Sequence, residues 1–513
     1  MGLAPFFEKA ALAGSHLLRD FEFDAFSRLL LAQTVRVAFD AQAANSREGK
    51  VTLELTVNLL ARLYPRLALT PLGAVDDAEI NRLTSLARSI NPNIEFTTEI
   101  NAATVCIVIG SMPVIGSVPT IYVGSDNWIT ALSIIAPVES GDSDNPFGAA
   151  AAACFGVANV FRTTFADQLA GAISEENWKI SLLDMDERTT LFNPPVESID
   201  LGESHLVGVG AIGNAAVWAL TRAPFLKGIL HLIDDEEIDD TNPQRYVLAG
   251  ANDVGISKVV LAQKALSQSP LEVHSHALSW GQYLRTRDNW CLDRVTVALD
   301  TPEDRRLVQT ALPRWIVNAW TQPDDLGISR HGFANSQACL MCLYMPEGAV
   351  PDLDDQIVRA LNLPDDDETL RAVRLLLVTE EPIGMPWVER IAAANGVTTE
   401  RLLELQNLPI RSFYQKAICG GILLSLGANI STTPRNTKVP MAFQSALAGI
   451  LLAAELAAHA AGLKISHRSV TTKINLLRPL GCDLSLPAPQ HSSGKCICQD
   501  EDYIKVYRSK YGL

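Results

Sequence analysis

Residues 205–220 read HLVGVGAIGNAAVWAL, in which an apolar run leads into a Gly-x-Gly-x-x-Gly turn and then into a helical pattern. The glycines of the turn are Gly208, Gly210 and Gly213. Such a turn lets the backbone approach phosphate closely, and the unpaired N–H groups at the start of the helix face the anion. The next apolar run, GILHLID, ends at Asp234, where a carboxylate can bind a ribose hydroxyl. The stretch predicts a Rossmann-like nucleotide-binding fold.

Further strand candidates follow the turn, with helical patterns between them. They are LEVHSHA from Leu271, RVTVALD ending at Asp300 and RWIVNAW from Arg314. This alternation predicts an α/β fold with a mostly parallel sheet covered by helices. Ligands of such sheets lie at the carboxyl ends of the strands, where Gly208, Asp234 and Asp300 all fall.

Residues before about 195 show a fainter version of the same order. Apolar runs such as TVCIVIGS and PTIYVGS alternate with helical patterns, and the Ala-rich segment from Gly148 resembles the one from Met441. SREGK stands where a glycine turn is expected, and Gly110 stands where the second half has Asp300. We expect two Rossmann-like halves, the first degenerate and inactive. An unrelated α/β domain is the alternative.

Composition narrows the class of protein. The 513 residues carry a net charge of −16, which argues against nucleic-acid and anionic-membrane partners because both require a basic surface. The most apolar segment, 441–463, contains Gln444, Glu455 and His459, so it is expected to be a buried helix. The N-terminus lacks a charged region before its apolar residues, which favours a cytoplasmic protein.

The stretch HLIDDEEIDDTNPQRY resembles the signature that follows the glycine turn in the ThiF, MoeB and ubiquitin-activating superfamily. The matching residues are Asp234, Asn242 and Arg245, followed by Lys258, Asp300 and Arg305, over about 100 residues. Two departures are Thr301 after Asp300, where an asparagine is frequent, and Glu236 in place of an aspartate.

The resemblance implies adenylation, in which a carboxylate attacks the α-phosphate of ATP and pyrophosphate leaves. Arg245 and Lys258 are then expected to offset triphosphate charge, Asp300 to hold Mg²⁺ and Asp234 to bind ribose. Asn242 belongs to the same nucleotide-binding set. A capped turn with a surface ion pair is the alternative for Asn242 and Arg245.

Nine cysteines are unevenly placed, with one pair at Cys339 and Cys342 and another at Cys496 and Cys498. Four thiolates fit a closed tetrahedral Zn²⁺ site of structural type. The family often has two Cys-x-x-Cys pairs, from which the tighter Cys496-x-Cys498 departs. Four reduced cysteines without metal are the alternative.

A mainly helical insert of about 95 residues separates Tyr344 from Val439. It contains Cys419, which the resemblance to ubiquitin-like activators makes the candidate thioester nucleophile, with Cys482 next. Lys416 or a helix N-terminus would lower the pKa of the thiol, whereas the apolar ILLSLG nearby favours a buried core cysteine. Arg28 resembles a family arginine that reaches the nucleotide of the other half; a solvent-facing helix arginine is the alternative.

These inferences divide the chain into residues 1–197 (inactive half), 198–345 (active half), 346–437 (insert) and 438–513 (return of the active half with zinc ligands). The preferred function is activation of a ubiquitin-like protein and its transfer through Cys419 to a conjugating enzyme. The chain looks most like activators of bacterial antiphage conjugation operons, and a homodimer is possible. Rivals are a sulfur-carrier-protein adenylyltransferase, a peptide- or tRNA-modifying enzyme and an NAD-dependent oxidoreductase; a non-enzymatic scaffold is disfavoured.

Overall fold

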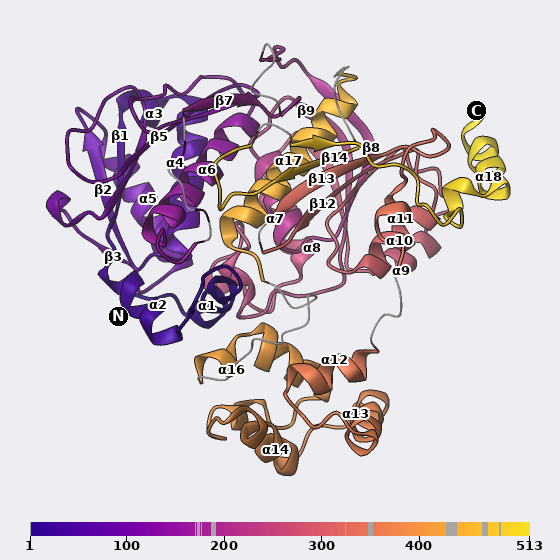
Figure 1. Cartoon of the computed structure of the whole chain (residues 1–513). Coiled ribbons are helices and arrows are strands. Elements are labelled where there is room, and N and C mark those ends of the chain that lie inside the picture. The colour runs from indigo at the N-terminus through magenta and orange to yellow at the C-terminus, as the bar shows by residue number, and fades with distance from the viewer. Residues whose placement is uncertain are drawn as a thin grey trace. The chain divides into compact units, whose positions relative to one another are not determined.

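The computed structural model describes residues 2–169, 171, 175, 177–185, 191–323, 325–346, 352–426, 439–463, 470–481 and 484–513. The chain divides into two compact units (Figure 1). The sheet unit comprises Met1–Pro5, Leu31–Met345 and Ala442–Leu513, and the helical unit comprises Phe6–Leu30 and Pro346–Met441. This grouping differs from the predicted division, because helices near the N-terminus cluster with the insert rather than with the first sheet.

The second half of the sheet unit contains an eight-stranded sheet in the order β10-β9-β8-β11-β12-β13-β14-β15. The first five strands in this order pair in parallel and the last three pairings are antiparallel. The strands are β8 (Ile199–Val207), β9 (Leu226–Ile233), β10 (Leu271–His276), β11 (Arg294–Val297), β12 (Trp315–Thr321), β13 (Leu326–His331), β14 (Thr471–Ile474) and β15 (Ser485–Leu486).

The first half contains a seven-stranded sheet in the order β3-β2-β1-β4-β5-β6-β7. It has the same succession of parallel pairings followed by antiparallel ones. The strands are β1 (Val35–Asp40), β2 (Arg66–Leu72), β3 (Glu95–Phe96), β4 (Val105–Ile109), β5 (Thr120–Asp126), β6 (Ile129–Ser133) and β7 (Trp178–Ser181). The shared order confirms the prediction of two Rossmann-like halves.

Two Ala-rich helices, α6 (Phe147–Thr164) and α17 (Ala442–Ala460), pack on each other between the two sheets (Figure 1). The helix α17 is long and apolar enough to cross a membrane, yet 94% of its most apolar window is buried inside the structure. Its Glu455 accepts a hydrogen bond of 2.6 Å from Arg330 Nε on β13. These contacts make α17 a core helix, as its polar residues predict.

The remaining helices of the sheet unit cover the two sheets and form the C-terminus. They are α3 (Ala41–Asn45), α4 (Arg47–Ala61), α5 (Asp77–Ile90), α7 (Ala211–Leu220), α8 (Lys258–Ala265), α9 (Trp280–Arg285), α10 (Pro302–Thr310), α11 (Leu340–Leu343) and α18 (Glu501–Tyr511). The central strands are apolar throughout because both faces are covered: every residue of β1 and β4 is buried.

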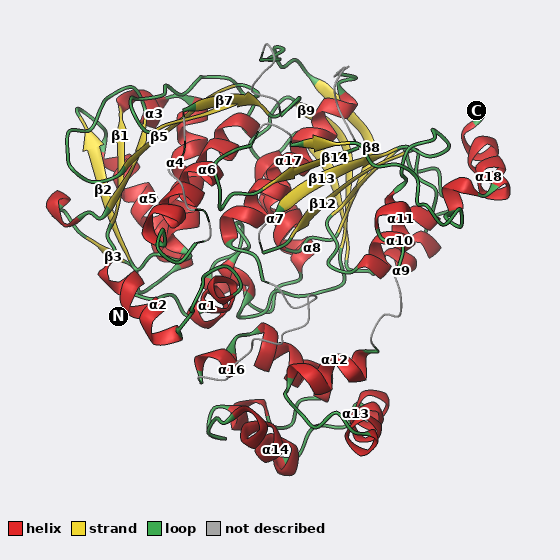
Figure 2. Cartoon of the chain, in the orientation of Figure 1, coloured by secondary structure: helices red, strands yellow, loops and turns green. Residues whose placement is uncertain are grey.

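The described residues of the helical unit form helices and connecting loops (Figure 2). Its helices are α1 (Phe7–Ser15), α2 (Phe23–Ala32), α12 (Leu353–Ala360), α13 (Asp367–Thr379), α14 (Met385–Asn395), α15 (Ile410–Tyr414) and α16 (Ile422–Ser425). The insert has its own core, which includes Ile357, Val388 and Phe413. Helix α1 joins this unit by packing on α16 and by an ion pair of 2.7 Å between Glu8 and Arg401.

Candidate nucleotide-binding site and cysteine cluster

The glycine turn connects β8 to α7, and two of its glycines are required by the local geometry. Gly208 has a φ of +90°, in the left-handed region that glycine favours. A Cβ on Gly213 would lie 2.1 Å from the carbonyl oxygen of Gly208. Gly210 is the N-cap residue of α7. The turn therefore packs the N-terminus of α7 closely against the end of β8, as in phosphate-binding turns.

Asp234 follows β9 and lies against the same turn. Its Oδ2 accepts a hydrogen bond of 2.7 Å from Val209 N, and its Oδ1 accepts one of 2.9 Å from Glu236 N. Burial raises the pKa of Asp234, and the charge of Lys258 opposes that shift. The carboxylate thus lies at the edge where sequence predicts ribose binding.

Lys258 begins α8 and is buried, with its ammonium paired to the carboxylate of Glu236. Burial disfavours the charged ammonium, but attraction from Tyr246, Asp234 and Glu236 prevails and raises the pKa of Lys258. The side chain of Glu236 is 70% exposed, so the partner of this buried cation faces solvent. The side chain therefore keeps its full positive charge at the carboxyl ends of the parallel strands, near the glycine turn and Asp234. We call this part of the sheet the nucleotide edge.

Tyr246 lies among the predicted residues, although no motif in the sequence points to it. Its ring is buried, and the charged groups of Arg245 and Lys258 lie 5.7 Å and 5.6 Å from the ring centroid. The charges of both side chains and of Asp300 act on its hydroxyl, and burial raises the pKa of that hydroxyl. A Cβ on Gly210 would lie 3.5 Å from the same oxygen. Tyr246 therefore connects the turn to the predicted phosphate-binding residues.

Several polar atoms around this edge are buried without a hydrogen-bond partner in the described part of the chain. They are Asn242 Oδ1, Arg245 Nη1 and Ser257 Oγ. Buried polar atoms are nearly always hydrogen-bonded in native proteins. An amide oxygen, a guanidinium nitrogen and a hydroxyl fit a ligand that has both anionic and hydroxyl groups, as ATP does.

Asp300 is exposed after β11, whereas the neighbouring Arg305 is buried. Arg305 Nε donates a hydrogen bond of 2.8 Å to the carbonyl of Leu299, and its guanidinium also donates to the hydroxyl of Tyr344. Arg305 thus shapes the turn that presents Asp300, and the structure does not place it as a phosphate ligand. An exposed carboxylate at the carboxyl end of a parallel strand, near Arg245 and Lys258, fits a Mg²⁺ ligand.

The first half supports this edge through Arg62, the C-cap residue of α4, which the sequence analysis missed. Its guanidinium donates to the carbonyls of Pro243 and Ala249, the latter at 3.2 Å, and its Nε donates to Asn58 Oδ1 at 3.0 Å. Burial lowers the pKa of Arg62 to about 9. The loop that carries Asn242 and Arg245 is therefore held from the other half. Only the fold brings these residues together, since they are about 180 positions apart.

The corresponding edge of the first half is filled by its own carboxylate. Asp40 accepts hydrogen bonds from Ala43 N at 3.0 Å, Ser111 N at 2.8 Å and Met112 N at 2.9 Å. The Asp40 carboxylate thus occupies backbone N–H groups that could otherwise bind a phosphate. Gly110 directly follows β4, which ends at Ile109, whereas Asp300 lies three residues beyond the end of β11 at Val297. The equivalence expected for these two positions stays a prediction.

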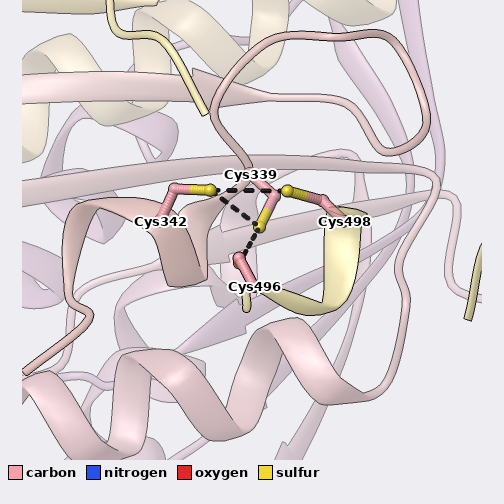
Figure 3. Close-up of side chains that lie close together, drawn as sticks. All are labelled: Cys339, Cys342, Cys496 and Cys498. Carbon is pink, nitrogen blue, oxygen red and sulfur yellow. Dashed lines mark hydrogen bonds between the residues drawn. The ribbon is translucent and has the colours of Figure 1, made fainter. Parts of the chain in front are cut away.

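The four predicted zinc ligands lie together, and their sulfur atoms point toward one another (Figure 3). Cys339 and Cys342 are at the start of and within α11, and Cys496 and Cys498 are in the segment just before α18. The Sγ atoms of Cys339 and Cys496 are 3.5 Å apart, and those of Cys342 and Cys498 are 3.4 Å apart. Tetrahedral zinc with Zn–S bonds near 2.3 Å requires S–S separations of about 3.8 Å. The residues fit a structural zinc ion.

Three predicted residues are not placed by the structure in any site. The backbone of Cys419 ends the π-helical segment η6 (Gln415–Cys419), but its side chain and the whole of Cys482 lie outside the described residues. Arg28 is exposed on α2 and belongs to the helical unit. The roles predicted for these residues stay predictions.

Two parts of the chain match known protein families. Residues 196–314 match the ThiF family, and residues 38–166 match a family described as prokaryotic E2 family C. The chain is 49% identical over 513 residues to the "Uncharacterized protein y4jF" of Sinorhizobium fredii, covering 100% of this chain and 98% of that protein. Among solved structures, E. coli MccB matches with a TM-score of 0.33 and 16% identity, over 58% of this chain and 65% of that chain.

The two Rossmann-like halves and the match of residues 196–314 to the ThiF family support an adenylating enzyme, and adenylation of the ThiF type implies ATP and Mg²⁺. The chain belongs to the ThiF and ubiquitin-activating superfamily and, within it, to the family of y4jF.

Proposed function

We propose that the chain activates a ubiquitin-like protein by adenylating its C-terminal carboxylate. A carboxylate oxygen attacks the α-phosphorus of ATP, the bond to the β-phosphate breaks, and pyrophosphate leaves. The observation that carries the proposal is that the glycine turn, Arg245 and Lys258 all lie close to Tyr246, on whose hydroxyl the charge of Asp300 also acts. Arg245 and Lys258 provide positive charge where the triphosphate develops negative charge.

Each residue has a distinct task in this step. Backbone N–H groups of the turn and of the start of α7 bind phosphate, and Asp234 binds ribose. Arg245 and Lys258 offset the phosphate charge, with phosphate replacing the exposed carboxylate of Glu236 beside Lys258. Asp300 would hold Mg²⁺, which neutralises phosphate charge when bound.

The second proposed step is transfer of the activated carbonyl to Cys419. Its thiolate attacks the acyl carbon, AMP leaves, and the resulting thioester passes to a conjugating enzyme. The insert that contains Cys419 has its own core, which supports a separate role for it. The chain resembles the activators of bacterial antiphage conjugation operons, so the proposed pathway serves antiviral defence in the bacterial cytoplasm.

The match of residues 38–166 to prokaryotic E2 family C supports a role in ubiquitin-like conjugation. The cysteines in that segment, Cys106 and Cys154, are both fully buried. Burial raises the pKa of Cys106 to about 11 and raises that of Cys154 as well. Since neither thiol is suited to thioester exchange, we propose that the conjugating enzyme is a separate partner and that this half is an inactive adenylation fold.

The test is ATP/pyrophosphate exchange by the purified full chain with Mg²⁺ and the ubiquitin-like protein encoded nearby. Exchange should depend on the carrier's C-terminal carboxylate and should be abolished by Asp300→Ala. Asp293→Ala, at an exposed aspartate just before β11, is the matched control and should retain exchange. Normal exchange by Asp300→Ala would remove this carboxylate from the mechanism.

The rivals give different results in the same assay. A sulfur-carrier activator would adenylate its carrier and hand it to a sulfurtransferase without a thioester on the chain. A peptide- or tRNA-modifying enzyme would exchange only with that substrate. An NAD-dependent oxidoreductase would show no exchange, and it has no need of so much positive charge at the phosphates.

A further inference from the structure

Histidines gather on one face of the second sheet, on three neighbouring strands. His205 on β8 pairs with His231 on β9, which pairs with His274 on β10. The ring centroids of these neighbours are 4.8 Å and 5.2 Å apart and the rings are stacked. His276 lies two residues beyond His274, so its side chain is on the same face. None of these residues has a task in adenylation.

A carboxylate completes the group. Glu203 lies two residues before His205 on β8, and its Oε1 is 3.0 Å from His231 Nε2. Ligand atoms of Glu203, His205 and His231 all lie within 4.8 Å of one another. Arg287 Nη2 also lies 2.8 Å from Glu203 Oε1. A carboxylate has about four lone-pair positions, so it can bind a guanidinium and a second cation together.

His205 is the member whose surroundings point to a ligand. The side chain of His205 is 1% exposed. Neither of its ring nitrogens makes a well-formed hydrogen bond within the described residues. The backbone of Arg294 lies close enough to favour the protonated ring. By contrast, both nitrogens of His231 have partners, since its Nδ1 is 3.0 Å from His276 Nε2. An unpartnered imidazole at 1% exposure is costly unless something binds it.

Imidazole binds a metal ion through a ring nitrogen of its neutral form. Metal-binding histidines usually have a second partner that orients the ring, and His276 is placed to orient His231 in this way.

We infer that Glu203, His205 and His231 bind a divalent transition-metal ion such as Zn²⁺, separately from the cysteine cluster and the nucleotide edge. Two imidazoles and one carboxylate form a ligand set that zinc and its neighbours prefer and that Mg²⁺ does not. Three protein ligands leave a further coordination position for water. The proposed metal site is set back along the strands from the nucleotide edge. On β8, His205 lies three residues before Gly208, and on β9, His231 lies three residues before Asp234.

The test is the zinc content of the full-length protein after equilibrium dialysis against buffered Zn²⁺. Glu203→Gln should hold one zinc ion fewer per chain than the wild type, and so should His205→Gln. His274→Gln is the matched control, because His274 stacks on His231 but is not among the ligands, and it should hold the wild-type amount. Cys339→Ser should lose a different zinc ion, so its loss and that of Glu203→Gln should add.

Two results of the zinc measurement would overturn the site. One is equal zinc content in the wild type and Glu203→Gln, and the other is an equal loss of zinc from Glu203→Gln and His274→Gln. Glu203 is partly exposed, so its amide variant should fold even where His205→Gln does not. Binding of Co²⁺ gives a second readout, because a site without thiolates lacks the sulfur-to-metal absorption of the cysteine cluster. If Glu203→Gln leaves the Co²⁺ spectrum of the Cys339→Ser protein unchanged, the inference is wrong.

Discussion

The charge of Lys258 depends on three neighbours, because burial alone would favour its neutral form. Tyr246, Asp234 and Glu236 together raise its pKa. The ammonium is thereby preorganised for phosphate rather than recruited when ATP arrives. Preorganised charge is the main way in which proteins stabilise a transition state that accumulates negative charge.

Replacing Lys258 by alanine should lower ATP/pyrophosphate exchange by about 100-fold or more, in the range found when one preorganised donor is lost. Lys264→Ala is the control, because Lys264 is exposed on the same helix. Exchange kinetics that are equal in the two variants would show that Lys258 does not contact the triphosphate.

A second residue-scale prediction concerns Gly213. A Cβ at this position would lie 2.1 Å from Gly208 O, so Gly213→Ala must displace α7 from the turn. We expect a loss of about 1–3 kcal/mol in the free energy of unfolding, as for other overpacked sites, together with weaker ATP binding. Gly281→Ala in α9 is the control: nothing lies within 4 Å of its added Cβ, so it should be neutral or stabilising in thermal unfolding.

Among elements, α4 connects the degenerate half to the active one through Arg62. Arg62→Met keeps most of the apolar volume but leaves the carbonyls of Pro243 and Ala249 without their donor. Each unsatisfied buried group costs about 1–3 kcal/mol, so we expect a lower melting temperature and a higher KM for ATP. Arg66→Ala, which removes an exposed pair with Glu95, should change neither measurement.

The cysteine cluster ties α11 to the segment before α18. Cys339→Ser should remove zinc from that cluster and lower the melting temperature, because structural zinc contributes directly to folding. The exposed Cys291 provides the control, since Cys291→Ser should retain both zinc and stability. A wild-type protein whose zinc content is unaffected by Cys339→Ser would contradict the cluster's role.

The elements that sequence predicts best are those with local signals. The runs LEVHSHA, RVTVALD and RWIVNAW correspond to β10, β11 and β12, and the glycine turn lies between β8 and α7. Arg62 and Tyr246 could not be found in the same way, because the importance of each arises from contacts across the fold.

At the scale of the whole molecule, the chain combines an adenylating edge in the sheet unit with a cysteine in the helical unit. Helices α1 and α2 cluster with the insert, so the helical unit is built from two separate stretches of sequence. Arg28 belongs to this unit, and its predicted role is tested by exchange kinetics of Arg28→Ala, which should be slower than wild type if the arginine reaches the nucleotide.

The two-step mechanism predicts that adenylation and thioester formation respond to different residues. Cys419→Ala should retain ATP/pyrophosphate exchange, because the residues proposed to bind phosphate lie in the sheet unit. It should lose the reductant-sensitive adduct with the ubiquitin-like protein and the transfer to a conjugating enzyme. Cys419→Ser should instead form an ester that resists reductant, since a serine oxygen replaces the thiol sulfur.

The control is Cys291→Ala, which removes an exposed thiol from the sheet unit and should leave both steps intact. An adduct that persists in Cys419→Ala would assign the nucleophile to another thiol, with Cys482 the next to test. A wild-type chain that adenylates its carrier yet forms no adduct would instead favour a sulfur-carrier or peptide-modifying enzyme. That result would not affect the proposed role of the nucleotide edge in adenylation. This role is tested separately by Lys258→Ala, whose measurement involves no thiol.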